Sequence, residues 1–147
     1  MIEINNLTTV SADEEFLKKV AEKVLESENK KESELSVALV GQGRIRELNK
    51  RYRGKNRVTD VLAFGGNDSL GEIVICLGEV KKNAKRLKST FKKELATCLI
   101  HGILHLLGYD HEKNEIAAKK MEEKEQYYLS RVGEIGEGSG EPFGSSV

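Results

Sequence analysis

The sequence predicts a single α+β domain in which a small mixed β-sheet packs with about five helices, one of them central and buried. Apolar residues recur with helical spacing in five segments and with strand spacing in four shorter ones. Strand and helix segments follow one another in mixed order, and no internal repeat is present. At 147 residues the chain is long enough for one domain with a sizeable core.

The first elements predict an edge strand followed by a covering helix. Ile2 and Ile4 alternate with polar residues within the strand predicted at 2–8. Ser11 and Glu14 have the spacing of a capping box, with Ser11 as the N-cap of the helix. One apolar stripe then runs along this helix: Phe16, Leu17, Val20, Ala21, Val24 and Leu25.

The middle of the chain predicts three strands and two basic helices. Residues 34–41 alternate as a strand does, and residues 59–64 and 71–77 predict a hairpin whose first strand is buried. Between these strands, a helix over 44–53 should turn three side chains inward: Ile45, Leu48 and Tyr52. A helix over 79–88 should do the same with Val80, Ala84 and Leu87.

The last third predicts a central helix and a final amphipathic one. Residues 90–107 are apolar almost all round from Leu95 onward, so this helix should be buried. A helix over about 112–131 places several apolar side chains on one side: Ile116, Ala117, Met121, Tyr128 and Leu129. We place the domain at residues 1–132. Residues 133–147 hold five glycines and three serines, and we predict a disordered tail there.

The charge of the chain is zero overall but uneven along it. Residues 41–93 carry fourteen Lys and Arg against five acids, whereas the segments before and after are acidic. This middle segment is a candidate surface for a polyanion. Each basic run taken alone is better explained as the solvated face of a helix.

Nothing in the sequence predicts a membrane partner. No apolar run reaches the roughly 18–20 residues of a membrane-spanning helix. The beginning of the chain lacks the basic and apolar regions of a secretory signal. We therefore expect a cytoplasmic protein in which Cys76 and Cys98 are reduced.

All three histidines of the chain lie within eleven residues, at the end of the predicted central helix. His101 and His105 leave the same helix face one turn apart. Gly108 can end the helix in the left-handed conformation, which allows His111 to return to that face. Three imidazoles suit Zn²⁺ and leave a fourth position for water, as in a catalytic site. We predict one metal ion per chain, zinc or another divalent metal.

The spacing of these histidines matches that of the metzincin proteases with one change. Those proteases have a glutamate general base after the first histidine, and here that position is Gly102. The ligands are therefore present without the protease base. Cys98, one turn before His101, is either a fourth ligand or, more often for such a residue, a buried free thiol.

Four segments together resemble one family. The segment His101–His111 is similar to the signature of the YbeY-type bacterial endoribonucleases, which act in ribosomal RNA maturation. Tyr52–Lys55, Thr59–Phe64 and Gly71–Cys76 resemble further conserved segments in the same order, so the resemblance covers about residues 34–130. It departs from the family at Val58, where proline is usual, at Ala63, where serine is usual, and at the turn Gly65–Gly66.

The resemblance implies a metal-dependent, single-strand-specific endoribonuclease. Its expected substrate is ribosomal RNA near the 3′ end of the small-subunit species, and its expected partner is the ribosome, including in ribosome quality control. Arg53 is then the cation that neutralises the phosphate. Asp110 is either a partner or proton carrier beside the third ligand or the N-cap of the last helix. Asp60 is expected to be structural, and either water or the 2′-hydroxyl could attack.

Two other functions remain open from the sequence. A metallopeptidase-like hydrolase fits the ligand spacing, but Gly102 opposes it because it cannot move a proton. A ribosome-associated protein with a structural zinc fits the basic segment equally well. An open coordination position would favour an enzyme over a structural metal.

Overall fold

A four-stranded mixed sheet forms the centre of the domain. The computed structural model of the chain describes residues 1–136. The strands are arranged in the order β1 (Ile2–Asn6), β2 (Leu35–Val40), β4 (Gly71–Cys76) and β3 (Val61–Gly65). The first two pairs in this order are parallel, and β3 pairs antiparallel with β4 as the predicted hairpin.

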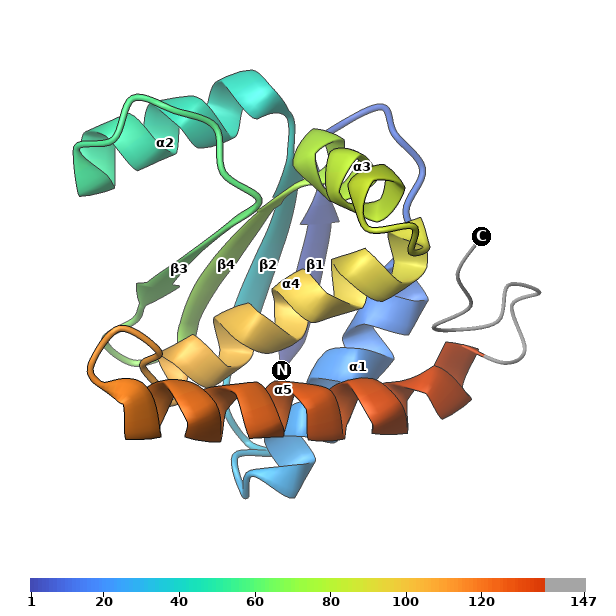
Figure 1. Cartoon of the computed structure of the whole chain (residues 1–147), viewed down its shortest axis with the longest axis vertical. Coiled ribbons are helices and arrows are strands. Elements are labelled where there is room, and N and C mark those ends of the chain that lie inside the picture. Colours follow the sequence, from blue (N-terminus) through green and yellow to red (C-terminus); the bar gives the residue numbers. More distant parts are fainter. Residues whose placement is uncertain (137–147) are drawn as a thin grey trace.

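Five helices cover the two faces of this sheet unequally (Figure 1). They are α1 (Glu14–Ser27), α2 (Gln42–Arg53), α3 (Leu77–Arg86), α4 (Phe91–Leu106) and α5 (Glu115–Gly136). The larger core lies between the sheet, α1, α3 and α4, with α5 packed on α4 and α1. A smaller core lies on the other face, beneath α2. The predicted α+β class, with its central buried helix, is therefore confirmed.

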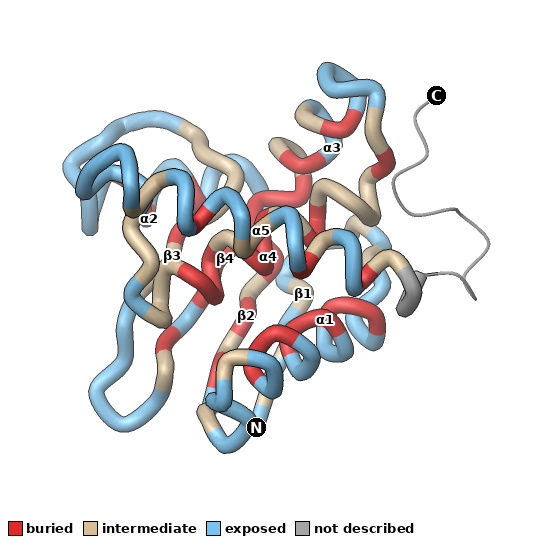
Figure 2. Tube along the Cα trace, turned by 60° about the horizontal axis from the view of Figure 1, so that its bottom comes forward, coloured by how far each residue is buried: buried red, intermediate tan, exposed pale blue. Residues whose placement is uncertain are grey.

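The alternation of strand residues explains why two separate cores form. In β4, Ile73 and Ile75 belong to the larger core, whereas Val74 belongs to the smaller one with Ile45 and Leu48 of α2. Successive side chains of a strand point to opposite faces, so a mostly apolar strand can support both layers. In Figure 2, α2 is largely exposed, as expected for a helix that covers only the smaller core.

The structure corrects several local predictions. The N-cap of α1 is Asp13, whose carboxylate accepts a hydrogen bond from the Phe16 amide, and not Ser11. The strand β3 is an edge strand in which only Leu62 is fully buried, because it has one neighbour instead of two. Three apolar side chains expected inside are exposed: Tyr52 at 60%, Leu87 at 53% and Ile116 at 82%. Each of the three lies at one end of its helix: Tyr52 is next to last in α2, Leu87 follows the last residue of α3, and Ile116 is the second residue of α5.

The end of the chain differs from the predicted boundary. The last helix continues to Gly136, four residues past the predicted limit of the domain at 132. The rest of the predicted tail, residues 137–147, lies outside the described residues. Within residues 1–136, no helix is both long and apolar enough to cross a membrane.

Candidate metal centre

Helix α4 approaches the sheet closely at the residue that follows the first histidine. A Cβ atom placed on Gly102 would lie 3.0 Å from two carbon atoms of the Ile73 side chain in β4. Glycine permits this close approach because it has no side chain. The position that carries the general base in metzincin proteases is thus used here for packing against β4.

The three histidines line one cavity of about 210 Å³. His101 and His105 come from α4, and His111 comes from the turn after it. Arg53 is the last residue of α2, the helix that covers the smaller core on the opposite face of the sheet. It nevertheless lines the same cavity. The remaining lining residues come from β3, from the segment before it, from α4 and from the turn: Thr59, Asp60, Val61, Ala63, Gly102 and Glu112.

The turn after α4 forms as the glycine predicts. Gly108 has a φ of 103°, in the region that favours glycine, and its amide donates to the carbonyl of His105 at 3.1 Å. The chain then doubles back, and the ring centre of His111 lies 5.3 Å from that of His101. Two imidazoles on one tetrahedral zinc have ring centres about 5 Å apart, given Zn–N bonds of roughly 2.0–2.1 Å.

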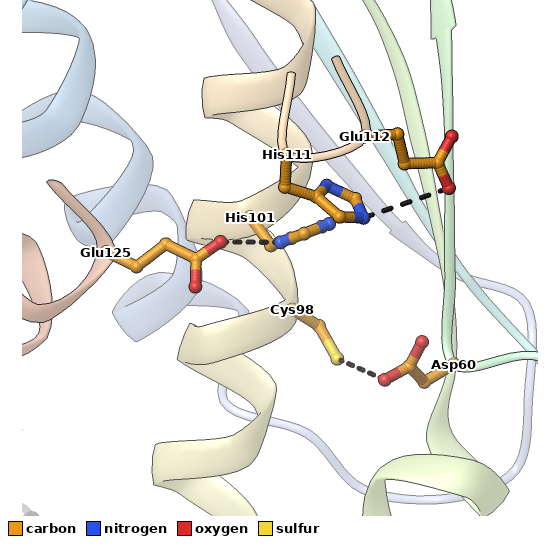
Figure 3. A network of polar contacts seen from close by, with 6 residues as sticks. All are labelled: Asp60, Cys98, His101, His111, Glu112 and Glu125. Carbon is orange, nitrogen blue, oxygen red and sulfur yellow. Dashed lines mark hydrogen bonds and ion pairs between the residues drawn. The ribbon is translucent and has the colours of Figure 1, made fainter. Parts of the chain in front are cut away.

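Glu125 of α5 orients the first histidine (Figure 3). Its carboxylate Oε1 lies 2.6 Å from Nδ1 of His101. This hydrogen bond raises the pKa of His101, against the lowering effect of burial. A neutral ring that donates from Nδ1 keeps the lone pair of Nε2 for a metal ion. Sequence analysis did not identify this partner, because the contact depends on how α5 packs against α4.

The environment of His105 favours the neutral form that a metal ligand requires. Burial lowers the pKa of His105, and the positive charge of Arg53 lowers it further. The nearby carboxylate of Asp110 opposes this effect. Arg53 is therefore close enough to act electrostatically on a predicted ligand, which agrees with its place in the cavity wall.

Asp60 lines the cavity and also contacts side chains of α3 and α4. Its Oδ2 accepts a hydrogen bond from the amide of Asn83 at 3.3 Å and lies 3.8 Å from the thiol of Cys98 (Figure 3). Burial, together with the charge of Asp60, raises the pKa of the Cys98 thiol well above its ordinary value. Cys98 is a buried free thiol that does not line the cavity of the three histidines, so its position does not favour a role as a fourth ligand.

Asp110 does not cap the last helix. Its Oδ1 accepts the backbone amide of Glu112 at 2.9 Å, within the turn. The N-cap of α5 is Asn114, whose side-chain oxygen accepts the amide of Ala117 at 2.8 Å. Asp110 lines a second cavity of about 360 Å³ on the other side of the turn, next to Tyr109.

Glu28, at the end of α1, holds the turn that carries His111. Its Oε1 accepts the Tyr109 hydroxyl at 2.8 Å, and its Oε2 accepts Lys124 at 3.0 Å and the hydroxyl of Tyr128. Although burial alone would raise it, these three hydrogen bonds hold the pKa of Glu28 below its ordinary value. The network joins α1, the turn and α5 through one carboxylate. Sequence analysis missed it because Glu28 lies in a polar run with no regular pattern.

The three histidines are grouped but not yet arranged as ligands. As the side chains stand, no three His, Cys, Asp or Glu residues within the described part of the chain form a group that could hold a metal ion. His111 is half-exposed, and its Nε2 lies 3.9 Å from the carboxylate of Glu112 (Figure 3). The donor set itself is chemically suited to zinc, since three imidazoles line one cavity and one of them is already oriented by a carboxylate.

Comparison with known proteins identifies a family that matches most of the chain. The family described as Endoribonuclease YbeY matches residues 3–133. A protein named Endoribonuclease YbeY from Thermodesulfovibrio yellowstonii is 43% identical, over 79% of this chain and 84% of its own length. Another of that name, from Sulfurihydrogenibium, is 44% identical over 72% of this chain and 74% of its own.

A solved structure shows the same fold. The solution structure of a Thermotoga maritima protein has a TM-score of 0.74 and 39% sequence identity, and the match covers 95% of this chain and 94% of that one. The family match includes most or all of every helix and strand and the complete three-histidine segment. The chain therefore belongs to the Endoribonuclease YbeY family.

Proposed function

We propose that this protein is a metal-dependent endoribonuclease that cleaves single-stranded ribosomal RNA, near the 3′ end of the small-subunit species, in the cytoplasm and on or near the ribosome. The observation that carries the proposal is the shared cavity of His101, His105, His111 and Arg53. It combines nitrogen donors for a metal with a guanidinium for phosphate. Membership of a family named for endoribonuclease activity supports the same reaction class.

Three histidines would hold one zinc ion or a similar divalent metal. His101 would bind through Nε2, because Nδ1 is committed to Glu125. His105 is kept neutral by burial and by the charge of Arg53. His111, which is half-exposed, would turn its ring away from Glu112 to complete the set. When bound, such an ion supplies Lewis acidity toward the scissile phosphate.

Arg53 would bind the phosphate beside the metal. Its planar guanidinium can donate two parallel hydrogen bonds to two phosphate oxygens. Charge that develops on the phosphate during cleavage is then balanced within the cavity. The position of Arg53 at the cavity wall, with its charge reaching His105, supports this role.

Two carboxylates are candidates for moving the proton of the nucleophile. Asp110 lies next to the third histidine, but it accepts a backbone amide and lines the adjoining cavity. Asp60 lines the same cavity as the histidines and uses Oδ2 for its contacts with Asn83 and Cys98. Asp60 is therefore better placed, and single Asn variants of the two residues would separate their contributions through the pH dependence of cleavage.

The structure disfavours a peptidase. A protease-type base at position 102 would have to displace Ile73, since even a Cβ atom lies 3.0 Å from that side chain. A purely structural zinc is disfavoured because Arg53, an exposed cation, shares the cavity wall with the histidines. Structural sites are closed by four protein ligands.

One experiment tests the metal and the activity together. Protein purified without chelator should contain about one zinc or similar ion per chain. The variant with His101, His105 and His111 all replaced by alanine should contain none and should not cleave single-stranded RNA. Unchanged metal content in that variant would exclude the three-histidine site. Hydrolysis of peptides by the wild type without cleavage of RNA would reverse the order of the two functions.

A further inference from the structure

An aromatic pair with one exposed ring and one partly buried ring lies at the edge strand that borders the cavity. Tyr52 of α2 and Phe64 of β3 pack edge to face, with ring centres 5.4 Å apart and planes inclined by 64°. Tyr52 is 60% exposed, although helical spacing predicts it inside. Within the described residues, no hydrogen bond holds its hydroxyl and Phe64 is its aromatic partner. Leaving a large ring in water is unfavourable, so its exposure calls for an explanation.

The pair adjoins the cavity through both of its elements. Tyr52 precedes Arg53, and Phe64 follows Ala63, and both Arg53 and Ala63 line the cavity of the three histidines. Successive strand side chains point to opposite faces, so Ala63 lies on the side of the larger core, whereas Phe64 packs on the α2 side of β3, where it meets Tyr52. The pair therefore lies across the edge strand from the histidines, next to Arg53, which lines the cavity from the end of α2. Figure 1 shows the elements that carry the two rings, the end of α2 and the edge strand β3, on one side of the molecule.

The surface around the pair is strongly basic. Between Gly41 and Val58 the chain carries seven Lys and Arg and a single acid, Glu47, which is paired with Arg44 at 2.7 Å. Most of this charge is exposed, including Arg51, Lys55 and Arg57. A ligand that lies here must be anionic and must also offer a flat apolar face. A single-stranded nucleic acid meets both requirements, because phosphates alternate with stackable bases.

We infer that Tyr52 and Phe64 form a stacking platform for an unpaired base of the RNA strand whose phosphate Arg53 holds. This inference rests on the proposed function, to which it adds a binding site for the nucleobase. Stacking selects single strands, because a base in a duplex has both faces covered. It tolerates different sequences, because every base has a π-face. Phe64 contacts the tyrosine ring edge to face, and Tyr52 supplies the exposed surface.

Direct detection of stacking is possible because the chain contains no tryptophan. The variant Tyr52→Trp places a single indole on the platform. We expect its fluorescence to be quenched when a single-stranded 2′-O-methyl oligoribonucleotide, which lacks the 2′-hydroxyl nucleophile, is added. Inorganic polyphosphate supplies the charge without bases and should bind without quenching. Quenching by polyphosphate to the same extent as by the oligonucleotide would overturn the platform.

A matched control comes from another exposed tyrosine. Tyr127 on α5 is 46% exposed and also lies beside a second aromatic ring and an arginine. Tyr127 resembles Tyr52 in its surroundings but lies outside the proposed platform. The variant Tyr127→Trp should keep its fluorescence when the oligonucleotide binds. Equal quenching in the two variants would show that the effect is not specific to the platform, and the inference would fail.

Affinity provides the second measurement. Removing the ring in Tyr52→Ala should weaken binding of a labelled oligonucleotide by about 5- to 150-fold, the effect of losing one stacked base. The slope of log affinity against log salt should stay the same, because no phosphate contact is lost. Tyr52→Phe should restore most of the lost affinity, since stacking needs the ring and not the hydroxyl. Wild-type affinity in Tyr52→Ala would refute the platform.

These binding measurements separate the inference from the proposed function. If the wild-type protein with zinc cleaves no RNA but Tyr52→Trp is quenched by oligonucleotide, the nuclease proposal fails and the base site stands. If the wild type cleaves RNA and Tyr52→Trp is not quenched while anisotropy shows binding, the base site fails alone. Thermal unfolding of each variant checks that the exposed substitution has not disturbed the fold.

Discussion

The carboxylate of Glu125 lies 2.6 Å from Nδ1 of His101, joining two residues that are 24 positions apart and belong to different helices. The contact determines which ring nitrogen of His101 faces the cavity. A carboxylate behind a ligating histidine fixes the ring and strengthens it as a donor. The geometry of the first ligand thus depends on the packing of α5 against α4.

Replacing Glu125 should weaken metal binding. We expect Glu125→Gln to lower zinc affinity by about 10- to 100-fold, the usual effect of losing such a partner. Competition with a fluorescent chelator measures this directly. Glu122, an exposed acid on the same helix, provides the control, and Glu122→Gln should bind zinc as the wild type does. Equal affinities in the two variants would show that Glu125 does not support the ligand.

Substituting Gly102 should destabilise the domain. Alanine there brings a carbon atom to 3.0 Å from Ile73, and overpacking of this kind costs about 1–3 kcal/mol. Urea unfolding gives the difference in the free energy of unfolding. Gly43, in α2, has no atom within 4 Å of an added Cβ, so Gly43→Ala should not reduce stability. A stable Gly102→Ala protein would contradict the tight packing of α4 on β4.

Removing Arg53 should impair RNA cleavage without affecting metal content. Arg53→Lys should restore activity only in part, because lysine keeps the charge and loses the two-pronged hydrogen bonding. Arg131→Ala, an exposed arginine on α5 that does not line the cavity, is the control and should cleave at close to the wild-type rate. In metal-free protein, Arg53→Ala should also raise the pKa of His105, since the Arg53 charge lowers it. Titration of His105 followed by NMR in the wild type and in Arg53→Ala measures this change. An unchanged pKa of His105 would show that Arg53 and His105 are not coupled.

Neutralising three lysines of α3 should weaken the binding of RNA whatever the base sequence of that RNA. Lys81, Lys82 and Lys85 are exposed, and each phosphate contact contributes about 0.7 to the salt slope for single strands. Glutamine at all three should therefore reduce that slope by up to about 2. The same change at Lys18, Lys19 and Lys23, exposed on α1, is the matched control. A salt slope that falls equally in both variants would mean that binding follows total charge and not this surface.

Glu28 should make the stability of the domain sensitive to acid. Its pKa in the folded protein is held below the ordinary value of 4.5 by three hydrogen bonds. Its contribution to the free energy of unfolding is therefore complete above 4.5 and is lost as the pH falls through the lowered value. Glu28→Gln should be less stable than the wild type at neutral pH and should lose less stability on acidification. Urea unfolding of both proteins at neutral pH and at a pH below 4.5 measures this difference. Equal losses of unfolding free energy in the two proteins on acidification would contradict this role.

The sequence predicted the elements of the site but not the contacts that support it. Histidine spacing and the turn at Gly108 follow from local geometry. The family resemblance pointed to Arg53, which lines the cavity, and its role toward phosphate stays a prediction. Glu28 and Glu125 could not be found in this way, because each acts on a residue far along the chain. Their positions follow from how α1 and α5 pack, which periodicity does not determine.

The same limit explains the errors. Tyr52 has the spacing of an inward residue, yet α2 extends past the edge of the sheet before it ends. Ser11 and Glu14 have the spacing of a capping box, but Asp13 lies closer to the first helical amides and caps α1 instead. Asp60 was expected to be structural, and the structure gives it that role together with a place in the cavity.

The dependence of the site on α5 has a consequence for the newly made protein. A chain emerges from the ribosome with its N-terminus first, so His101, His105 and His111 are synthesised before the helix that orients them. Until Glu125 and Tyr128 have been added and α5 has docked, the first ligand and the Glu28 network lack their partners. An unfinished chain is thus without the completed site. Synthesis and docking of α5 are therefore the steps after which His101 and the Glu28 network can take up their final arrangement.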